Sequence, residues 1–268
     1  MADKFGFIGT GNMGGALAQA VAKSIGGEQM LLADYFMDKA KELAAELHAQ
    51  AADNQTLAAE AQFIYLGVKP QMMAGVLAGI APVLKARTDR FVLVTMAAGL
   101  SIEKISEMAG GDYPIVRIMP NTPAAVGEGM ILYTANSLVT EEELKQFTEA
   151  MKCAGRLDRL DEKLIDAGCA ISGCGPAFMY LMIEALADGG VLCGLPRAKA
   201  MEYAAQTMIG AAKMVLETGK HPGELKDMVC SPGGSTIVGV KALEDCGFRS
   251  ACINAVVEAY EKTVNLGK

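Results

Sequence analysis

A short loop near the carboxyl end of the chain carries residue types that bind a small anion. Ser231-Pro232-Gly233-Gly234-Ser235-Thr236 sets two adjacent glycines between hydroxyl side chains. Glycines leave backbone N–H groups open to close approach, and residues 237–246 have the pattern of a helix, whose positive amino end would lie beside those groups. The segment predicts a pocket for a small carboxylate, with a glycine turn capped by serine or threonine as the alternative.

Six residues at the other end of the chain have the spacing of a dinucleotide-binding turn. Gly9-Thr10-Gly11-Asn12-Met13-Gly14 fits GxGxxG, follows an apolar strand and opens a helix. The first glycine permits the tight turn, the second lets a pyrophosphate approach the backbone, and the third lets the helix pack on the strand. An ordinary strand-helix turn is the alternative. A cofactor site and an anion pocket in separate halves indicate an oxidoreductase acting on a small acid.

Asp34 ends the second expected strand, 20 residues beyond Gly14. A carboxylate at this place accepts hydrogen bonds from the adenine ribose hydroxyls and repels a 2′-phosphate. The position therefore favours NADH over NADPH. The alternative is that Asp34 only caps the helix that begins near Met37.

Two further strand ends are candidates for cofactor contact. Val68-Lys69-Pro70 follows the third strand, and Lys69 there would reach a ribose or a phosphate, with a solvated loop lysine as the alternative. Ala97-Ala98-Gly99 follows the next strand, and its small side chains let the nicotinamide approach the backbone. A plain turn with Ser101 as the helix cap is the alternative there.

A loop in the middle of the chain contains two prolines. Pro120 and Pro123 hold the backbone of the segment 117–123 extended, so that Asn121 is presented in a fixed position. Its amide is a candidate to bond the carboxamide of nicotinamide or the substrate. A rigid loop between domains is the alternative interpretation.

The composition limits the possible partners. The 268-residue chain is 51% hydrophobic with a net charge of −7 and a pI near 5.0, which argues against nucleic acid and anionic membranes as partners. We find no apolar run of about 18 residues and no basic segment followed by an apolar one, so we expect a cytoplasmic protein without a membrane span. Seven cysteines without a CxxC pair, and two histidines, indicate reduced core thiols and no metal site.

The apolar pattern divides the chain into an α/β part and a helical part. Five apolar strands alternate with helices, which predicts a parallel sheet with helices on both faces. The expected strands are 5–8, 30–33, 63–68, 91–96 and 115–118. The expected helices are 14–25, 37–51, one from about 72 and one from 102. Beyond about residue 160 the pattern is helical, over 176–193, 197–218 and 249–266. These helices carry more apolar surface than one layer buries, which predicts a homodimer or larger oligomer.

Five segments resemble those of the pyrroline-5-carboxylate reductase family, over essentially the full length. They are FIGTGNMGGAL at 7–17, GVKPQ at 67–71, RIMPNTP at 117–123, ISGCGPAF at 171–178 and DMVCSPGGSTIVGVKALEDCGFR at 227–249. The last is the most specific and the glycine fingerprint the least. The resemblance implies a Rossmann-like dinucleotide-binding domain over 1–160, followed by an all-α dimerisation domain over 161–268.

The resemblance also implies a reaction and the residues that serve it. NAD(P)H would reduce 1-pyrroline-5-carboxylate to L-proline, with the substrate carboxylate on Ser231, Gly233, Gly234, Ser235 and Thr236. In relatives the dimer builds each active site, which implies that this loop serves the nicotinamide of the partner subunit. The positions that match family cofactor contacts are Asn54, Lys69, Ala97, Met119 and Asn121. Cys174 and Phe178 stand where serine and tyrosine are frequent, so no hydroxyl chemistry is expected at either.

The expected chemistry needs few ionisable groups. A protonated cyclic imine is already an activated electrophile, so the protein must bind its carboxylate, orient its ring and exclude water. We expect Thr236 to donate or relay a hydrogen bond to the ring nitrogen, as the one catalytic side chain.

Other functions compete with this one. A β-hydroxyacid dehydrogenase would need a lysine where this chain has Met179. A reductase of a related cyclic imine, or a non-catalytic dinucleotide sensor, are further alternatives.

Overall fold

Short apolar runs form the strands of one sheet in a computed structural model that describes residues 4–266. The eight strands lie in the order β3-β2-β1-β4-β5-β6-β7-β8. β6 and β7 pair antiparallel, and all other neighbours are parallel. The strands are β1 (Phe5–Ile8), β2 (Met30–Ala33), β3 (Gln50–Ala51), β4 (Phe63–Leu66), β5 (Val92–Thr95), β6 (Ile115–Met119), β7 (Gly129–Ala135) and β8 (Gly155–Arg159).

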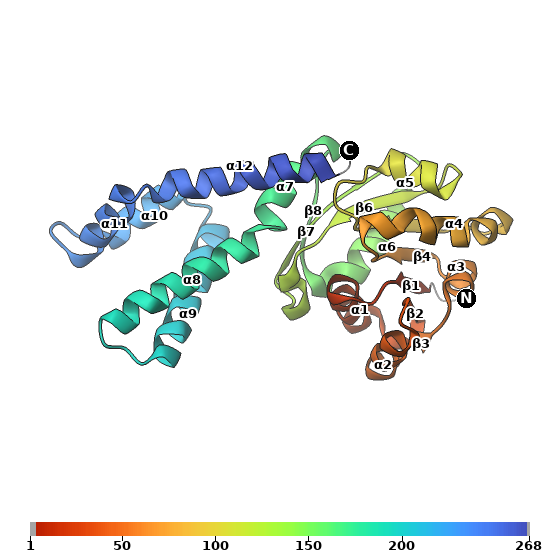
Figure 1. The fold of residues 1–268 in the computed structure, drawn as a ribbon, viewed down its shortest axis with the longest axis horizontal. Coiled ribbons are helices and arrows are strands. Elements are labelled where there is room, and N and C mark those ends of the chain that lie inside the picture. Colours follow the sequence, from red (N-terminus) through yellow and green to blue (C-terminus); the bar gives the residue numbers. More distant parts are fainter. Residues whose placement is uncertain (1–3, 267–268) are drawn as a thin grey trace. The chain divides into compact units, whose positions relative to one another are not determined.

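Helices cover both faces of this sheet, as the strand-helix alternation predicts (Figure 1). One buried cluster joins the sheet to α1 (Asn12–Ile25), α2 (Met37–Leu47) and α6 (Glu141–Met151). A second joins the other face to α3 (Asn54–Glu60), α4 (Pro70–Ala86) and α5 (Ile102–Ala109). The strands at the centre are buried on both sides, which explains why they read as continuous apolar runs.

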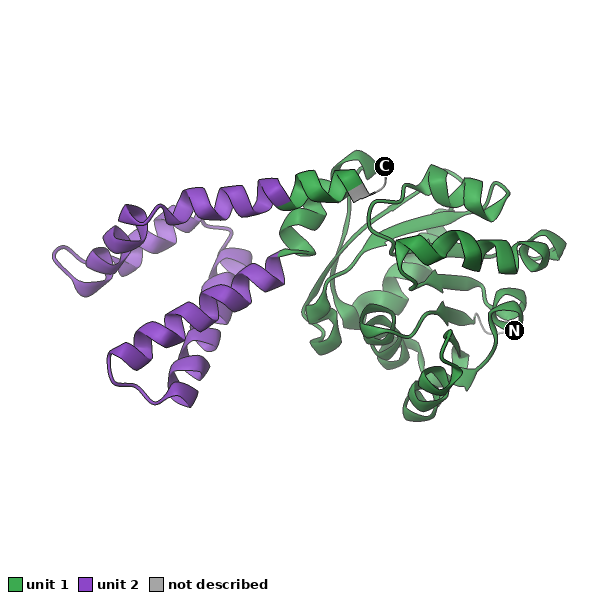
Figure 2. Ribbon diagram, viewed as in Figure 1, with its two compact units in different colours: residues 1–174, 259–268 green, residues 175–258 purple. Residues whose placement is uncertain are grey.

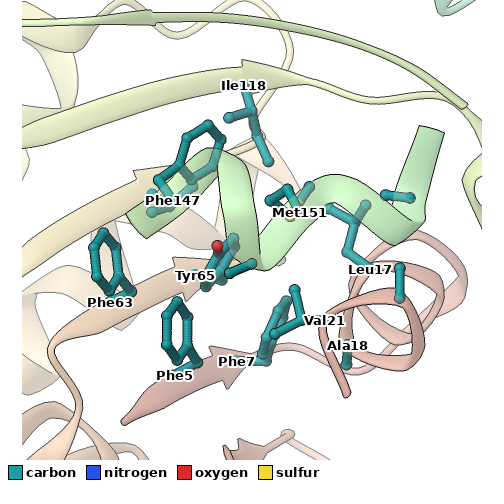
Figure 3. Packing of buried hydrophobic residues seen from close by; sticks show 14 of the residues in the cluster. Phe5, Phe7, Leu17, Ala18, Val21, Phe63, Tyr65, Ile118, Phe147 and Met151 are labelled. Carbon is teal, nitrogen blue, oxygen red and sulfur yellow. The ribbon is translucent and has the colours of Figure 1, made fainter. Parts of the chain in front are cut away.

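Aromatic pairs fix β1 beside β4 in the first cluster (Figure 3). Phe5 stacks on Phe63 with ring centroids 4.9 Å apart, and Phe7 stacks on Tyr65 at 4.3 Å. Each such pair contributes about 0.5–1.5 kcal/mol beyond its buried area. The chain order reverses between these two strands, so the carboxyl ends of β1, β2 and β4 meet at the point where open α/β sheets bind ligands.

Two expectations about this sheet are wrong. The helix expected over 37–51 ends at Leu47, because His48 takes a left-handed conformation (φ 56°) and Gln50–Ala51 pairs with β2 as β3. The sheet is also not all parallel, since β7 runs antiparallel to β6. β7, α6 and β8 are not among the elements expected from the sequence, although Thr140 and Glu143 form a capping box that marks the start of α6.

Glu143 has a second role at that helix start. Its carboxylate accepts hydrogen bonds from Arg90 Nε at 2.6 Å and from Thr140 N at 2.8 Å, and its side chain is 6% exposed. Burial alone would raise the pKa of Glu143, but the bonds from Arg90 and Thr140 outweigh it and hold the pKa below its usual value.

We expect Glu143→Gln to destabilise the fold at pH 7 by about 1.5–3 kcal/mol, since it removes a charged hydrogen-bonded pair. Because the folded pKa is lowered, the stabilisation by Glu143 is present above its unfolded pKa and is lost as the pH falls through the folded value. Urea unfolding at pH 7 and near pH 3 measures both terms. Glu141→Gln, in the same turn but 86% exposed, is the control. An equal deficit for Glu143→Gln at both pH values would contradict this role.

The chain divides into two compact units, residues up to 174 with those from 259, and residues 175–258 (Figure 2). The first contains the sheet and α7 (Glu162–Ser172), whose Ile165 and Cys169 pack against Met119 and Leu132. The helices beyond it are α8 (Gly175–Leu192), α9 (Arg197–Thr218), α10 (Pro222–Val229), α11 (Ser235–Asp245) and α12 (Phe248–Leu266), the last ending in the first unit.

The second unit buries little of its own apolar surface. α8 and α9 pack against each other, but the described side chains buried there are alanines, at 187, 200 and 204. Large apolar side chains remain exposed along its helices, among them Tyr180, Leu181, Leu192, Tyr203, Ile209, Leu216, Val238 and Ile253. Exposed apolar surface of this extent is typical of an interaction surface.

Two composition-based expectations need correction. The run Glu162–Leu192 does contain a window long and apolar enough to cross a membrane, by length and composition, with 17% of the window buried. The thiols are free, as expected, but Cys193, Cys246 and Cys252 are exposed and are not core residues. These three cysteines lie on or beside helices of the second unit, whose apolar faces are not covered within one chain.

Candidate functional site

Three glycines allow β1, α1 and β4 to meet at the fingerprint turn. Gly9 has a φ of +98°, and a Cβ at Gly14 would lie 2.0 Å from the Gly9 oxygen. A Cβ at Gly67, just after β4, would lie 2.6 Å from the same oxygen. The backbone can pass this point only without side chains. Gly67 is not among the site residues expected from the sequence. Its place directly after the apolar strand 63–66 is the signal that could have identified it.

Gly11 differs from these three glycines, because no protein atom lies where a side chain at this position would project. A Cβ there would meet nothing within 4 Å. Gly11 is the N-cap of α1, and no side chain caps that helix end in the described part of the chain. A cavity of about 460 Å³ adjoins this turn, and Thr10, Gly11 and Asn12 help to line it. Unpaired backbone N–H groups at a helix start suit an anion such as a pyrophosphate.

Asp34 is held in place by the fingerprint turn. Its Oδ2 accepts hydrogen bonds from Thr10 N at 2.7 Å and from Thr10 Oγ1 at 3.1 Å, while its Oδ1 accepts one from Phe36 N. The N-cap of α2 is Phe36 and has no side-chain bond, so Asp34 is not the cap of that helix. The Thr10 side chain, for which the sequence predicts no role, thus helps to orient Asp34.

Asn54 lies at the first turn of α3 and lines two adjoining cavities. One, of about 340 Å³, is lined by Asp34, Met37, Asp53, Asn54 and Gln55. The other, of about 440 Å³, adds Gln71, Met72 and the small residues of α4. Asp34 and Asn54, which are 20 positions apart in the sequence, therefore face one space at the outer end of the sheet.

The other strand ends expected to contact the cofactor lie at the same edge of the sheet. Lys69 is exposed as the N-cap of α4, Pro70 is its first residue, and Val68 packs on the second buried cluster. Ala97 is buried, Ala98 packs against Met119, and Gly99 has a φ of +75°. Ser101 caps α5, accepting from Lys104 N. Met13 packs partly on the core, so its backbone is what remains for a cofactor.

Asn121 is engaged by the protein backbone. Its Nδ2 donates to Ser172 O and its Oδ1 accepts from Met130 N, both at 2.9 Å, and the residue is 7% exposed. This geometry fits the rigid loop that was the alternative interpretation. The second Nδ2 hydrogen and the second lone pair of Oδ1 remain for a cofactor, and that contact stays a prediction.

A buried arginine that the sequence analysis did not single out braces this region. Arg117, on β6 and 3% exposed, pairs with Asp166 at 2.6 Å and with Glu162 at 3.4 Å, both on α7. Glu162 also accepts a hydrogen bond from Ile102 N at the start of α5. These bonds tie α7 to the strand ends that carry Ala97 and Met119.

The Ser231–Thr236 loop is a turn that opens directly into α11. Gly234 N donates to Ser231 O at 3.0 Å, Pro232 is the second residue of the turn, and Gly233 has a φ of +69°, the geometry of a type II turn. A Cβ at Gly234 would lie 2.4 Å from Ser231 Oγ. Gly233 is therefore required by the backbone of the turn, whereas a side chain at Gly234 would displace the Ser231 hydroxyl.

The first turn of α11 (Ser235–Asp245) contains no acidic side chain that could occupy its amino end. Gly234 is its N-cap, and no side chain of the described residues caps the helix. Thr236 lies in the first turn, exposed, with no hydrogen-bond partner for its hydroxyl among these residues. The alternative of a turn capped by serine or threonine is therefore not what the structure contains. His221 is the N-cap of α10 and accepts a hydrogen bond from Gly223 N.

The arrangement fits a dinucleotide at the sheet edge and a carboxylate at α11. A dinucleotide site needs glycines that permit close approach, an uncapped helix start and a carboxylate at the end of the second strand, and Gly9–Gly14, the start of α1 and Asp34 provide these parts. Across the described residues, no group of three or more His, Cys, Asp or Glu side chains converges to hold a metal ion.

Family models match both halves of the chain. Residues 162–266 match pyrroline-5-carboxylate reductase dimerisation, and residues 4–99 match NADP oxidoreductase, coenzyme F420-dependent. The exposed apolar helices thus lie in the part that matches a dimerisation family.

Curated and solved proteins are similar over the full length. Pyrroline-5-carboxylate reductase of Escherichia coli is 42% identical, with 100% of both chains covered. The solved pyrroline carboxylate reductase of Plasmodium falciparum with NADP bound is 35% identical, covering 100% of this chain and 99% of that one, at a TM-score of 0.87. The solved Coxiella burnetii pyrroline-5-carboxylate reductase is 29% identical, with 100% of both covered, at 0.90.

Proposed function

This chain belongs to the pyrroline-5-carboxylate reductase family, and we propose that it reduces 1-pyrroline-5-carboxylate to L-proline with NAD(P)H, the last step of proline synthesis. The observation that carries the substrate assignment is the uncapped start of α11 behind the Ser231–Thr236 turn. Backbone N–H groups at a helix start hold a carboxylate without a lysine or arginine.

The substrate site consists of the loop before α11 and its first turn. Ser231, the N–H groups of Gly233 and Gly234, and Ser235 hold the carboxylate, and Thr236 donates or relays a hydrogen bond to the ring nitrogen. The free hydroxyl of Thr236 and the closed turn support these roles. A hydrogen bond to the nitrogen favours the charge distribution of the reduced ring as hydride arrives at carbon.

The cofactor site lies along the carboxyl ends of the strands. When bound, NAD(P)H supplies the hydride. The residues that hold it are Gly9, Gly11, Asn12, Met13, Gly14, Asp34, Asn54, Val68, Lys69, Pro70, Ala97, Ala98, Gly99, Met119 and Asn121. Gly11 and the start of α1 support the pyrophosphate contact, and Asp34 supports the ribose contact.

Family membership and the residues present favour imine reduction over the other functions. A β-hydroxyacid dehydrogenase uses a lysine at the position of Met179, and methionine cannot act as its base. A sensor of dinucleotides would not need the carboxylate loop.

The oligomer and the location complete the proposal. The functional unit is a homodimer or a higher homo-oligomer formed through the helices of 161–268, with the dinucleotide domain over 1–160, in the cytoplasm. The match to a dimerisation family and the exposed apolar helices support the association.

Mixing the purified protein with 1-pyrroline-5-carboxylate and NADH or NADPH tests the reaction. We expect cofactor absorbance at 340 nm, the band of the reduced nicotinamide, to fall at roughly the rate at which proline forms. A six-membered cyclic imine is the comparison substrate. Dinucleotide binding without turnover of either imine would overturn the proposal in favour of the sensor.

A further inference from the structure

The adenosine end of the dinucleotide site has an unusual charge distribution for an enzyme that would use NADPH. The pyrophosphate site at the start of α1 and the position of Asp34 place the adenine ribose at the carboxyl end of β2. The cavity there is lined by Asp34, Met37, Asp53, Asn54 and Gln55. Two of these five residues are carboxylates, and none is basic.

Neither carboxylate is free to turn away. Asp34 accepts two hydrogen bonds from Thr10 and one from Phe36 N. Asp53 is the N-cap of α3 and accepts from Thr56 N at 2.7 Å. The backbone N–H of Thr56 holds the pKa of Asp53 below its usual value, so this carboxylate is charged at neutral pH. Both negative charges are therefore fixed parts of the cavity.

Lys39 and Lys41, the first basic residues after Asp34 in the sequence, have other neighbours. Lys39 Nζ lies over the Phe36 ring, 5.4 Å from its centroid, and lines the cavity at the start of α1 together with Glu42 and Glu46. Lys41 pairs with Asp38 at 3.7 Å. A 2′-phosphate binds where arginine or lysine neutralises it, and the lining of this ribose cavity contains neither.

We propose that Asp34 and Asp53 make this site select the free 2′-hydroxyl of NADH against the 2′-phosphate of NADPH. Asp34 is the specificity-determining residue, since it is oriented by Thr10 to accept hydrogen bonds from the ribose hydroxyls. Asp53 adds repulsion as the second carboxylate in the lining of the same cavity. The inference rests on the proposed function, because it assumes that a dinucleotide binds at this site. It predicts a cofactor preference that differs from the NADP seen in the solved Plasmodium falciparum relative.

The test compares two fragments that lack nicotinamide, ADP-ribose and its 2′-phosphate, by calorimetric titration of the intact protein. We expect ADP-ribose to bind at least about tenfold more tightly, a difference of roughly 1.4 kcal/mol. Because no imine takes part, this result is independent of whether 1-pyrroline-5-carboxylate is turned over.

Variants assign the selectivity to the two carboxylates. Asp34→Asn keeps an acceptor for Thr10 N and is expected to reduce the affinity ratio about tenfold, mainly through tighter binding of the 2′-phosphate. Asp53→Asn keeps a good helix cap and is expected to reduce the ratio by a smaller factor. Asp38→Asn removes the same charge from α2, where the side chain is 92% exposed and lines no described cavity, and is expected to leave the ratio unchanged.

Three outcomes would overturn the proposal. The first is equal or tighter binding of the 2′-phosphate by the unaltered protein. The second is a ratio unchanged in both Asp34→Asn and Asp53→Asn, each checked for folding by its melting curve. The third is an equal shift in Asp38→Asn, which would show a general effect of net charge.

Discussion

Thr236→Ala is expected to lower kcat/KM for 1-pyrroline-5-carboxylate by about 10²-fold, the low end of what one oriented hydrogen-bond donor contributes in a transition state. The side chain is in the first turn of α11, exposed, and its hydroxyl has no partner among the described residues. Its removal therefore breaks no described bond of the fold, and the loss falls on the reaction. Steady-state kinetics with saturating cofactor measures the effect.

Two companion variants separate the hydroxyl from the shape of the loop. Thr236→Ser keeps the hydroxyl and should recover most of the activity. Thr218→Ala removes another exposed threonine hydroxyl, which bonds Met214 O at the end of α9, and should leave kcat/KM unchanged. An unaltered kcat/KM in Thr236→Ala would remove this residue from the mechanism and leave carboxylate binding as the role of the loop.

The sequence predicts well the parts of this fold in which local pattern and tertiary environment agree. The strands 5–8 and 30–33 and the helix 197–218 have the bounds that their apolar patterns predict. The sequence predicts a helix over 37–51, because alanine, lysine and glutamate favour a helix. In the structure this helix ends at Leu47, because His48 is left-handed and Gln50–Ala51 pairs with β2. That pairing is a tertiary effect which a local pattern does not contain.

The candidate site shows the same division. The glycine spacing predicts the turn at Gly9–Gly14, because the need for a side-chain-free backbone is local. It does not predict the hydrogen bond from Thr10 to Asp34, whose residues are 24 positions apart. Nor does it predict that the Asn121 amide bonds Ser172 and Met130, which are 51 and 9 positions away. Hydrogen bonds across such separations depend on the packed sheet and on α7.

Two glycines of the fingerprint, Gly11 and Gly14, are needed for different reasons, and substitution by alanine distinguishes the reasons. Gly11→Ala is expected to fold normally, since its φ is −67° and a Cβ would meet nothing within 4 Å. The methyl group would instead occupy the path of the pyrophosphate. Loss of one charged hydrogen bond costs about 1.5–3 kcal/mol, so the Kd for NADH should rise by about 10- to 100-fold.

Gly14→Ala supplies the contrast that makes this result interpretable. A Cβ there would lie 2.0 Å from the Gly9 oxygen, so this variant should lose thermal stability together with NADH binding. Melting curves and fluorescence titration on both proteins give the comparison. Unchanged NADH affinity in Gly11→Ala would mean that the pyrophosphate does not cross the start of α1, and the cofactor would then have to be placed elsewhere on the sheet. A parallel loss of melting temperature in both variants would mean that Gly11 serves the fold, as Gly14 does.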